Sequence, residues 1–195
     1  MNRTIMTAAA ASLALLVLAG CGGDDPATDD GDAPTSAAES SPPTGDAPTD
    51  LATAEIAVGW EDAVAAARKD FDGDLAEVGM DTERTPASYK VELVSESEEY
   101  KVLVDADSAE LSGAETERID GDDIDEARDE IVDTGAVISW DDALEAAQGE
   151  QTGSVVEWKL EGTGRGPRYE FDFGGGGADV EVGVDAVSGE IVPGD

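Results

Sequence analysis

The chain has 195 residues, a length that fits one or two small domains. Asp and Glu number 47 while Lys and Arg number 11, so the formal net charge is -36 and nucleic acids or anionic lipid surfaces would repel the protein. The absence of histidine removes the usual proton shuttle, histidine-activated nucleophiles and histidine-ligated zinc. We therefore expect no enzyme activity, cofactor, metal site, catalytic residue or nucleic-acid partner.

The first 20 residues have the pattern of an export signal. Arg3 precedes an apolar run over residues 8–19, which is too short to cross a bilayer and has the form of a signal-peptide core. The tetrad LAGC at residues 18–21 resembles the lipobox of bacterial lipoproteins. This resemblance implies that residues 1–20 are removed and that lipid on Cys21 holds the protein on the extracytoplasmic face of the cell membrane. A plain secretory signal and an uncleaved anchor are the alternatives.

Residues 21–55 have the composition of a disordered acidic tether. The segment contains five prolines and no lysine, arginine or aromatic residue. It cannot bury enough apolar area to offset the conformational entropy lost on folding. A flexible chain of this length reaches on the order of 30 Å, which would hold the folded part clear of the membrane.

The rest of the chain contains an internal duplication with an offset of 80 residues. Trp60 recurs as Trp140, and the phrase VLVDADSAEL at residues 102–111 recurs as VGVDAVSGEI at residues 182–191. Because the offset holds without gaps over the whole repeat, the pattern indicates two copies of one structural unit.

Each copy begins with residues of helical period. Apolar side chains follow Trp60 at helical spacing through residue 71, and they follow Trp140 through residue 147. Ser139 stands at the N-cap position of the second helix, with Asp142 three residues later. The sequence therefore predicts one amphipathic helix at the start of each copy.

Period two then replaces the helical period, which predicts three half-buried strands per copy and a short fourth strand at the end. The expected strands are residues 76–80, 89–93 and 100–104 in the first copy, and 156–160, 169–173, 180–184 and 190–192 in the second. Residues 95–99 and 174–177 are the expected turns between the second and third strands.

The duplicated phrase itself is explained as a strand that runs into a tight turn. The Asp185 carboxylate can accept hydrogen bonds from backbone amides two residues later, and Gly189 can adopt a positive φ without strain. Ala109 replaces that glycine in the first copy, so its turn must differ or carry strain. We interpret both aspartates as structural residues and not as ligands.

These elements predict an α+β protein of two separately packed tandem units, each with one helix on an antiparallel sheet of three to four strands. Because cores of about 60 residues are marginal by themselves, packing of the two units against each other is the alternative. The first unit covers residues 56–111 and the second covers residues 136–195. Residues 112–135 form an acidic linker that contains a possible short helix, because Ile124, Ala127 and Ile131 have near-helical spacing.

This order of elements resembles the PepSY domain. The shared features are an aromatic residue early in the helix, a tyrosine in the second strand and a last hairpin that reads V-x-V-D-A-x-S-G-E-I. Residues 136–192 match this pattern, and residues 56–111 depart from it at Ala109. The resemblance implies binding of a peptide or a protease, in some cases inhibition, and it supplies no catalytic residues.

We therefore expect a lipid-anchored, non-catalytic module that binds an unidentified extracytoplasmic protein or peptide, for instance a peptidase. The alternative is an acidic, cation-binding or salt-adapted surface protein without a specific protein partner. A free strand edge could accept a peptide. Four charged residues in the predicted strands would protect such edges from pairing, namely Lys90, Glu92, Glu99 and Lys101.

Two acidic segments are weak candidates for cation binding. Residues 70–81 place aspartates at calcium-loop spacing, but Leu75 stands where the loop requires glycine. Residues 121–126 fit a solvated helix start better than a metal site. We expect neither segment to hold an ordered metal ion.

Overall fold

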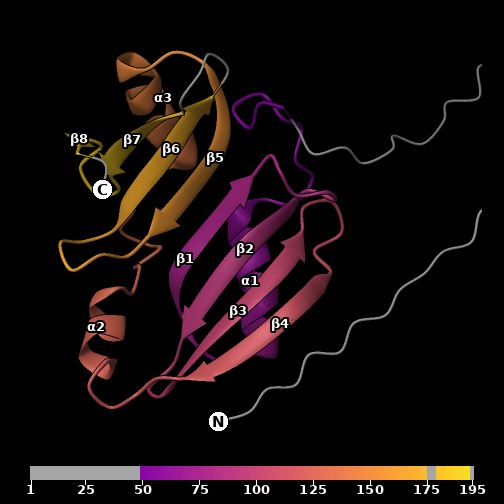
Figure 1. Cartoon of the computed structure of the whole chain (residues 1–195), viewed down its shortest axis with the longest axis vertical. Helices are drawn as coiled ribbons and strands as arrows, with labels where there is room; N and C mark the ends of the chain where they lie inside the picture. Colours follow the sequence, from indigo (N-terminus) through magenta and orange to yellow (C-terminus); the bar gives the residue numbers. More distant parts are fainter. Residues whose placement is uncertain (1–48, 175–178, 194–195) are drawn as a thin grey trace, which may run out of the picture. The chain divides into compact units, whose positions relative to one another are not determined.

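The computed structural model describes residues 49–174 and 179–193. Within them, two helices pack on a continuous antiparallel sheet of eight strands in the order β4-β3-β2-β1-β5-β6-β7-β8 (Figure 1). The elements in chain order are α1 (Trp60–Asp70), β1 (Asp74–Asp81), β2 (Ser88–Val94), β3 (Glu98–Asp105), β4 (Leu111–Arg118), α2 (Ile124–Asp129), α3 (Trp140–Glu150), β5 (Ser154–Glu161), β6 (Arg168–Gly174), β7 (Val180–Asp185) and β8 (Ile191–Val192). The α+β class and the helix followed by strands in each copy are confirmed. Residues 175–178 of the turn between β6 and β7 lie outside the described part of the chain.

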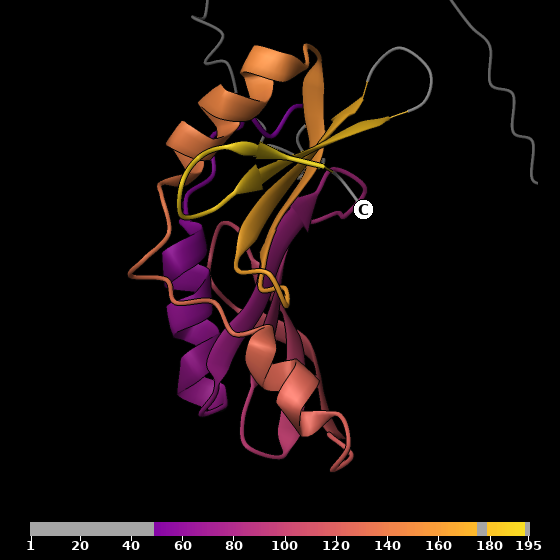
Figure 2. The same ribbon diagram turned by 90° about the vertical axis from the view of Figure 1, so that its left-hand side faces the viewer.

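The long helices α1 and α3 cover the same face of the sheet (Figure 2). Each buries a stripe of small side chains, such as Ala63 and Ala67 in α1, which allows close approach to the strands. Ser139 caps α3 as predicted, because its hydroxyl accepts a hydrogen bond from the Asp142 amide at 3.1 Å. The short helix α2 buries no side chain.

Equivalent tyrosines in the two units connect the segment before each long helix to the sheet by a hydrogen bond. The Tyr89 hydroxyl donates to the Val58 carbonyl at 2.7 Å, and the Tyr169 hydroxyl donates to the Ile138 carbonyl at 3.0 Å. Burial, followed by the charge of Glu61, raises the pKa of Tyr89 to about 12 and also raises the pKa of Tyr169. Both hydroxyls therefore stay protonated at neutral pH and can donate these hydrogen bonds.

The two units are not packed separately but against each other, the stated alternative, because β1 of the first unit pairs with β5 of the second. Gly79 lies opposite Lys159, its own equivalent in the second copy. The same register places Val78 opposite Leu160 and Met80 opposite Trp158, so the pairing is symmetric about Gly79. The two copies thus meet across a local two-fold axis and share one hydrophobic core.

The segment before each helix crosses to the other unit. The Leu51 amide donates to the Val155 carbonyl of β5 at 2.8 Å, and the Val132 amide donates to the Leu75 carbonyl of β1 at 2.7 Å. Leu51 is only 5% exposed and Val132 only 3%. Asp50 strengthens the first crossing, since its carboxylate accepts from the Val155 amide at 3.0 Å. Residues 50–55 of the predicted tether therefore belong to the folded part of the chain.

Part of the predicted linker belongs to the sheet. Strand β4 begins at Leu111 and pairs with β3 along most of its length, so residues 112–118 are not a linker. The possible short helix in this region is α2. Beyond α2 the chain passes so close to the end of β5 that a Cβ atom on Gly162 would overlap the Glu130 carbonyl. Strand β4 of the first unit has eight residues, whereas the equivalent β8 has two.

The duplicated turn has the same structure in both copies. The Asp185 carboxylate accepts from the amides of Val187 at 3.0 Å and Ser188 at 2.7 Å, as predicted. Gly189 has a φ of 75°, and Ala109 has a φ of 59° at the equivalent position. The first copy therefore keeps the turn and places an alanine in the left-handed region, where its Cβ is disfavoured.

Substitution of either residue by its equivalent in the other copy is expected to change stability, in opposite directions for the two variants. Ala109→Gly should increase the free energy of unfolding by about 1 kcal/mol, because it removes left-handed strain. Gly189→Ala should decrease it by a similar amount, since the new Cβ meets only ordinary contacts and introduces strain alone. Urea denaturation of both variants measures the difference, and equal changes of the same sign would contradict the assignment.

Candidate functional site

The one site residue that the sequence predicted, the lipid attachment residue Cys21, lies outside the described residues. The two acidic segments are placed as structural elements: residues 74–81 form β1, and residues 124–126 open α2. In the described part of the chain, no group of three or more Asp, Glu, His or Cys side chains is arranged to hold a metal ion.

The face of the sheet opposite α1 and α3 carries a continuous array of charged side chains, which we call the open face. Figure 1 looks onto it, with α1 behind the strands. Strand alternation places apolar residues on the helix side and charged residues here. The open face comprises Glu77, Asp81, Lys90, Glu92, Glu99, Lys101, Glu157, Lys159, Glu161, Arg168, Glu170 and Asp172.

In the first unit, charges on neighbouring strands of the open face form pairs. Lys90 contacts Glu77 at 2.8 Å, and Lys101 contacts both Glu92, at 3.4 Å, and Glu99. Strands β2 and β3 lie inside the sheet, so the prediction that these residues protect strand edges is wrong. Lys90–Glu77 and Lys101–Glu92 are instead cross-strand pairs between interior strands, whereas Lys101 and Glu99 lie two residues apart on β3.

The second unit holds the more buried part of the array. Arg168 forms an ion pair with Glu161 at 3.0 Å and a second one with Glu170, a residue that is only 4% exposed. Lys159 contacts Glu161 at 3.2 Å and Glu170 as well. Burial by itself lowers the pKa of Lys159. The hydrogen bond to Glu170 and the charge of Glu161 act in the opposite direction and outweigh it, so the pKa is raised. Two carboxylates and two cations thus compensate one another at the centre of this unit.

Beside this cluster lies a strip of carboxylates that repel one another. Glu157 pairs in register with Asp81 of β1 and with Asp172 of β6. Partial burial, followed by the charges of Asp172 and Asp81, raises the pKa of Glu157. Partial burial and the charge of Glu181 raise the pKa of Asp172. The strip where the two units meet therefore carries excess negative charge and attracts cationic groups.

The raised carboxyl pKa values predict that stability increases when the pH falls from 7 toward about 5. A folded state that binds protons more tightly than the unfolded state is stabilised below the raised pKa and loses this stability as the pH rises through it. Asp105 and Asp185 act in the opposite direction at lower pH, because hydrogen bonds from their turns lower their pKa values. Their contribution is lost as the pH falls below about 4.

Thermal unfolding as a function of pH tests this expectation. Glu157→Gln with Asp172→Asn should flatten the slope between pH 5 and pH 7, and 0.5 M salt should reduce it by screening the repulsion. Glu145→Gln on the exposed side of α3 is the matched control, and it should retain the slope. A maximum of stability at neutral pH in low salt would contradict the expectation.

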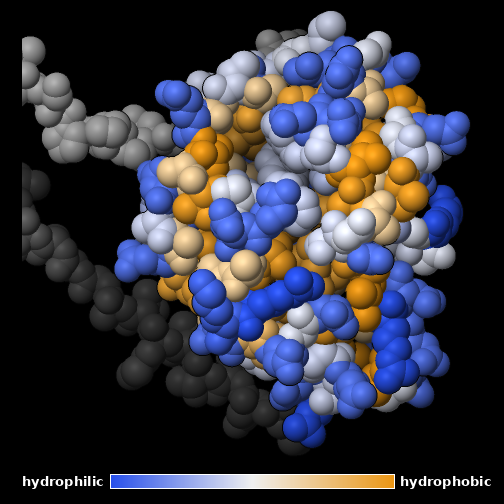
Figure 3. All heavy atoms as spheres, turned by 180° about the vertical axis from the view of Figure 1, so that it is seen from behind, coloured by the Kyte–Doolittle hydropathy of each residue, from blue (hydrophilic) through white to orange (hydrophobic). Residues whose placement is uncertain are grey.

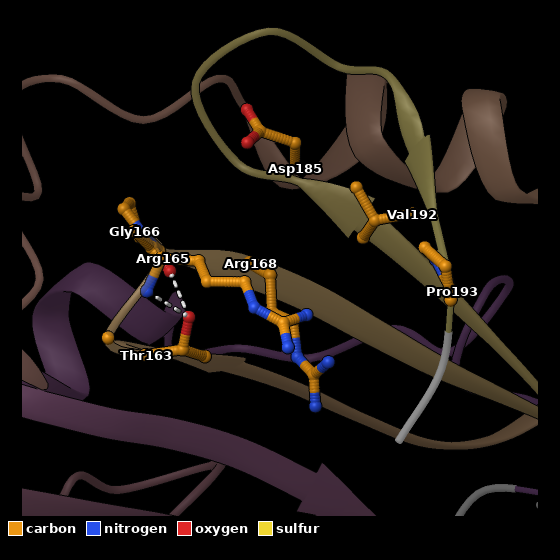
Figure 4. A pocket seen from close by; sticks show the side chains of 9 residues that line it. Thr163, Arg165, Gly166, Arg168, Asp185, Val192 and Pro193 are labelled. Carbon is orange, nitrogen blue, oxygen red and sulfur yellow. Dashed lines mark hydrogen bonds between the residues drawn. The ribbon is translucent and has the colours of Figure 1, made fainter.

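A shallow pocket of about 490 Å³ lies where the turn between β5 and β6 meets the C-terminal hairpin. Figure 4 shows the side chains of Arg165 and Arg168 extending in the same direction, while the Asp185 carboxylate points toward its own turn. The Thr163 hydroxyl donates to the Gly166 carbonyl at 2.8 Å and holds the turn in shape. Arg165 is exposed, so this end of the open face presents an accessible cation.

The open face is thus a broad charged surface in which carboxylates outnumber cations, so it attracts cationic groups. Arg168 and Glu170 were not among the site residues predicted from the sequence. The alternation in RYEFDF at residues 168–173 could have identified them, because it places the charged residues on one face of the strand and three aromatic residues on the other.

Comparison with known proteins identifies a structural neighbour and a family. The crystal structure of a candidate lipoprotein from Clostridium difficile 630 superposes with a TM-score of 0.68 at 25% sequence identity, over 74% of this chain and 96% of that one. The search of curated proteins found no match. Within the described residues, no helix combines the length and apolar character needed to cross a membrane.

The sequence profile of the PepSY family, the peptidase propeptide and YPEB domain, matches residues 60–115 and 137–192. Each match covers one helix and the three strands that follow it; the first match ends within β4, at residue 115, and the second includes β8. PepSY domains are generally non-catalytic modules of the propeptide or inhibitor type. Since the two matches together cover more than half of the chain, this protein belongs to the PepSY family, with one domain in each half of the eight-stranded sheet.

Proposed function

We propose that this protein is a lipid-anchored, non-catalytic module on the extracytoplasmic face of the cell membrane, and that its open face binds an envelope protein. The observation that carries the proposal is the pair of PepSY domains joined in one sheet. A peptidase is the first class of partner to test, because the family includes peptidase propeptides. The likeness to a candidate lipoprotein supports the anchor.

The fused sheet supports binding by a single broad surface. The β1–β5 pairing makes the charged residues of both units continuous, so one partner can contact both units at once. The carboxylates between the units favour a basic patch on that partner. Such an interaction gains its association rate from electrostatic attraction and weakens as salt screens the charges.

Crosslinking in intact cells, followed by affinity capture of the full-length lipid-anchored protein, tests the proposal. Glu157→Arg is the informative variant, because it reverses a charge in the carboxylate strip and also relieves repulsion there, so folding is not endangered. Its matched control is Glu145→Arg on the exposed side of α3. We expect the native protein and the control to capture the same partner, and Glu157→Arg to lose it.

Peptidase assays with the captured protein then decide between partner classes. A change in peptidase activity on addition of the module supports inhibition or regulation. Capture of the same proteins by Glu157→Arg would show that the open face is not the binding surface. If no specific protein is recovered at native ionic strength, and calorimetry with calcium detects many weak sites, the acidic cation-binding surface protein is the better description.

Removal of the lipid attachment residue is expected to release the protein from membranes. The LAGC tetrad at residues 18–21 predicts that Cys21→Ser prevents lipid attachment, so the variant should appear in the soluble fraction or remain unprocessed. Fractionation with a nonionic detergent and mass spectrometry of the mature N-terminus measure the result. A mature protein with an unmodified Cys21 thiol would contradict the anchor.

A further inference from the structure

A small cavity lies on the helix side of the sheet, where the two PepSY units meet. Its volume is about 200 Å³, and its lining includes Trp60, Tyr89, Trp140 and Trp158 together with Met80 and Glu61. Met80 and Trp158 are opposite each other in the central β1–β5 pair, so the cavity lies near the local two-fold axis. Figure 3 views the molecule from this side and shows apolar atoms at the surface between polar side chains.

The aromatic rings of the cavity stand at steep angles to one another. The Tyr89 and Trp158 ring centroids lie 6.3 Å apart with an interplanar angle of 75°. Those of Trp140 and Trp158 lie 5.8 Å apart with an angle of 66°. Trp158 thus contacts both rings at steep angles, and the three aromatic side chains line the cavity without stacking on one another.

The charge around the cavity is negative. Glu61, in the first turn of α1, is exposed and contributes to the lining. Its charge reaches the buried hydroxyls of Tyr89 and Tyr169, since after burial it is the second cause of their raised pKa values. The described residues that line the cavity include no lysine or arginine. A cation that enters would therefore meet aromatic side chains and a carboxylate, with no lysine or arginine among the described residues of the lining.

We propose that this cavity binds an alkylated ammonium group, such as the head of a small quaternary ammonium compound. The faces of tryptophan and tyrosine attract cations electrostatically, and the attraction is strongest for a cation that is weakly hydrated. A metal ion or free ammonium would lose its water ligands to apolar walls that cannot replace them. The volume lies below the usual range for drug-sized ligands, so the cavity fits a head group.

Titration of the protein with tetramethylammonium and with choline tests the proposal. Tryptophan fluorescence and calorimetry report binding, at an ionic strength kept constant with sodium chloride. 3,3-Dimethylbutan-1-ol, which has the shape of choline without the charge, is the matched ligand. We expect choline to bind about tenfold more tightly than this alcohol. Equal affinity of the two compounds, or no saturable binding of either cation, would overturn the proposal.

Variants identify the residues responsible. Glu61→Gln should weaken choline binding severalfold and leave the alcohol unaffected, while Glu145→Gln on α3 should change neither. Trp140→Leu keeps an apolar, helix-compatible side chain in the partly exposed position and should remove the preference for the cation. Circular dichroism confirms that each variant is folded. Unchanged choline affinity in both Glu61→Gln and Trp140→Leu would contradict the assignment.

This site is independent of the proposed function. Glu157→Arg on the open face should retain choline binding, and Glu61→Gln should retain capture of the envelope partner. Failure of one experiment therefore leaves the other proposal standing.

Discussion

Replacement of Gly79 by valine is expected to reduce the free energy of unfolding by about 3 kcal/mol. A Cβ atom on residue 79 would lie 2.6 Å from the Trp158 carbonyl oxygen and 3.0 Å from the Lys159 Cβ atom. Neither neighbour can yield easily, because both belong to the strand paired with β1. Although valine favours strands, the central β1–β5 pair would have to separate.

Guanidinium chloride denaturation measures this effect, and limited proteolysis shows whether the two units separate. Gly149→Ala is the matched glycine control, since nothing lies within 4 Å of its added Cβ in α3. That variant should be more stable by about 0.5–1 kcal/mol, because alanine is the better helix former. If Gly79→Val unfolds at the same denaturant concentration as the native protein, the two strands do not approach this closely.

Truncation of Leu51 to alanine should cost about 3 kcal/mol of unfolding free energy. Leu51 precedes the first helix but is buried in the shared core, and its backbone is bonded to β5 of the second unit. Its loss would leave a cavity that the surrounding strands cannot fill. The same reasoning predicts that a soluble form starting at residue 56 is much less stable than one starting at residue 49.

Thermal and urea unfolding of Leu51→Ala and Thr53→Ala compare a buried with an exposed position of the same segment. Thr53→Ala should change the free energy of unfolding by less than about 0.5 kcal/mol. Equal stability of the two variants would show that the segment before α1 is not part of the fold. Equal stability of the soluble forms that start at residues 49 and 56 would support the same conclusion.

The local elements could be predicted because each depends on residues near one another in the chain. The helical spacing after Trp60 and Trp140, the period-two strands and the Ser139 cap all require only the pattern of apolar and polar residues. The duplicated turn was equally readable, since the Asp185 carboxylate bonds to amides within three residues. Comparison of the two copies also predicted that the turn at Ala109 either differs or carries strain, and the structure shows the second outcome.

The candidate site was less predictable. The sequence places Arg168 and Glu170 on one side of a strand, but it does not identify the strands beside them. Their burial and ion pairs depend on Lys159 and Glu161 of β5. In the same way, the cavity lined by Trp60, Trp140 and Trp158 exists because three parts of the chain meet there.

The sequence alone therefore determined the repeat, its α+β class, the positions of the two long helices and of the strands other than β4, and the family resemblance. The tertiary structure decided that the two units share one sheet, that Leu51 and Val132 cross between them, and that β4 extends beyond the first repeat. The physical reason is that alternation specifies which face a side chain occupies and not which strand becomes its neighbour. Gly79 permits the close approach to β5, but a glycine in a strand is compatible with several structures, and only the three-dimensional contact shows which one is adopted.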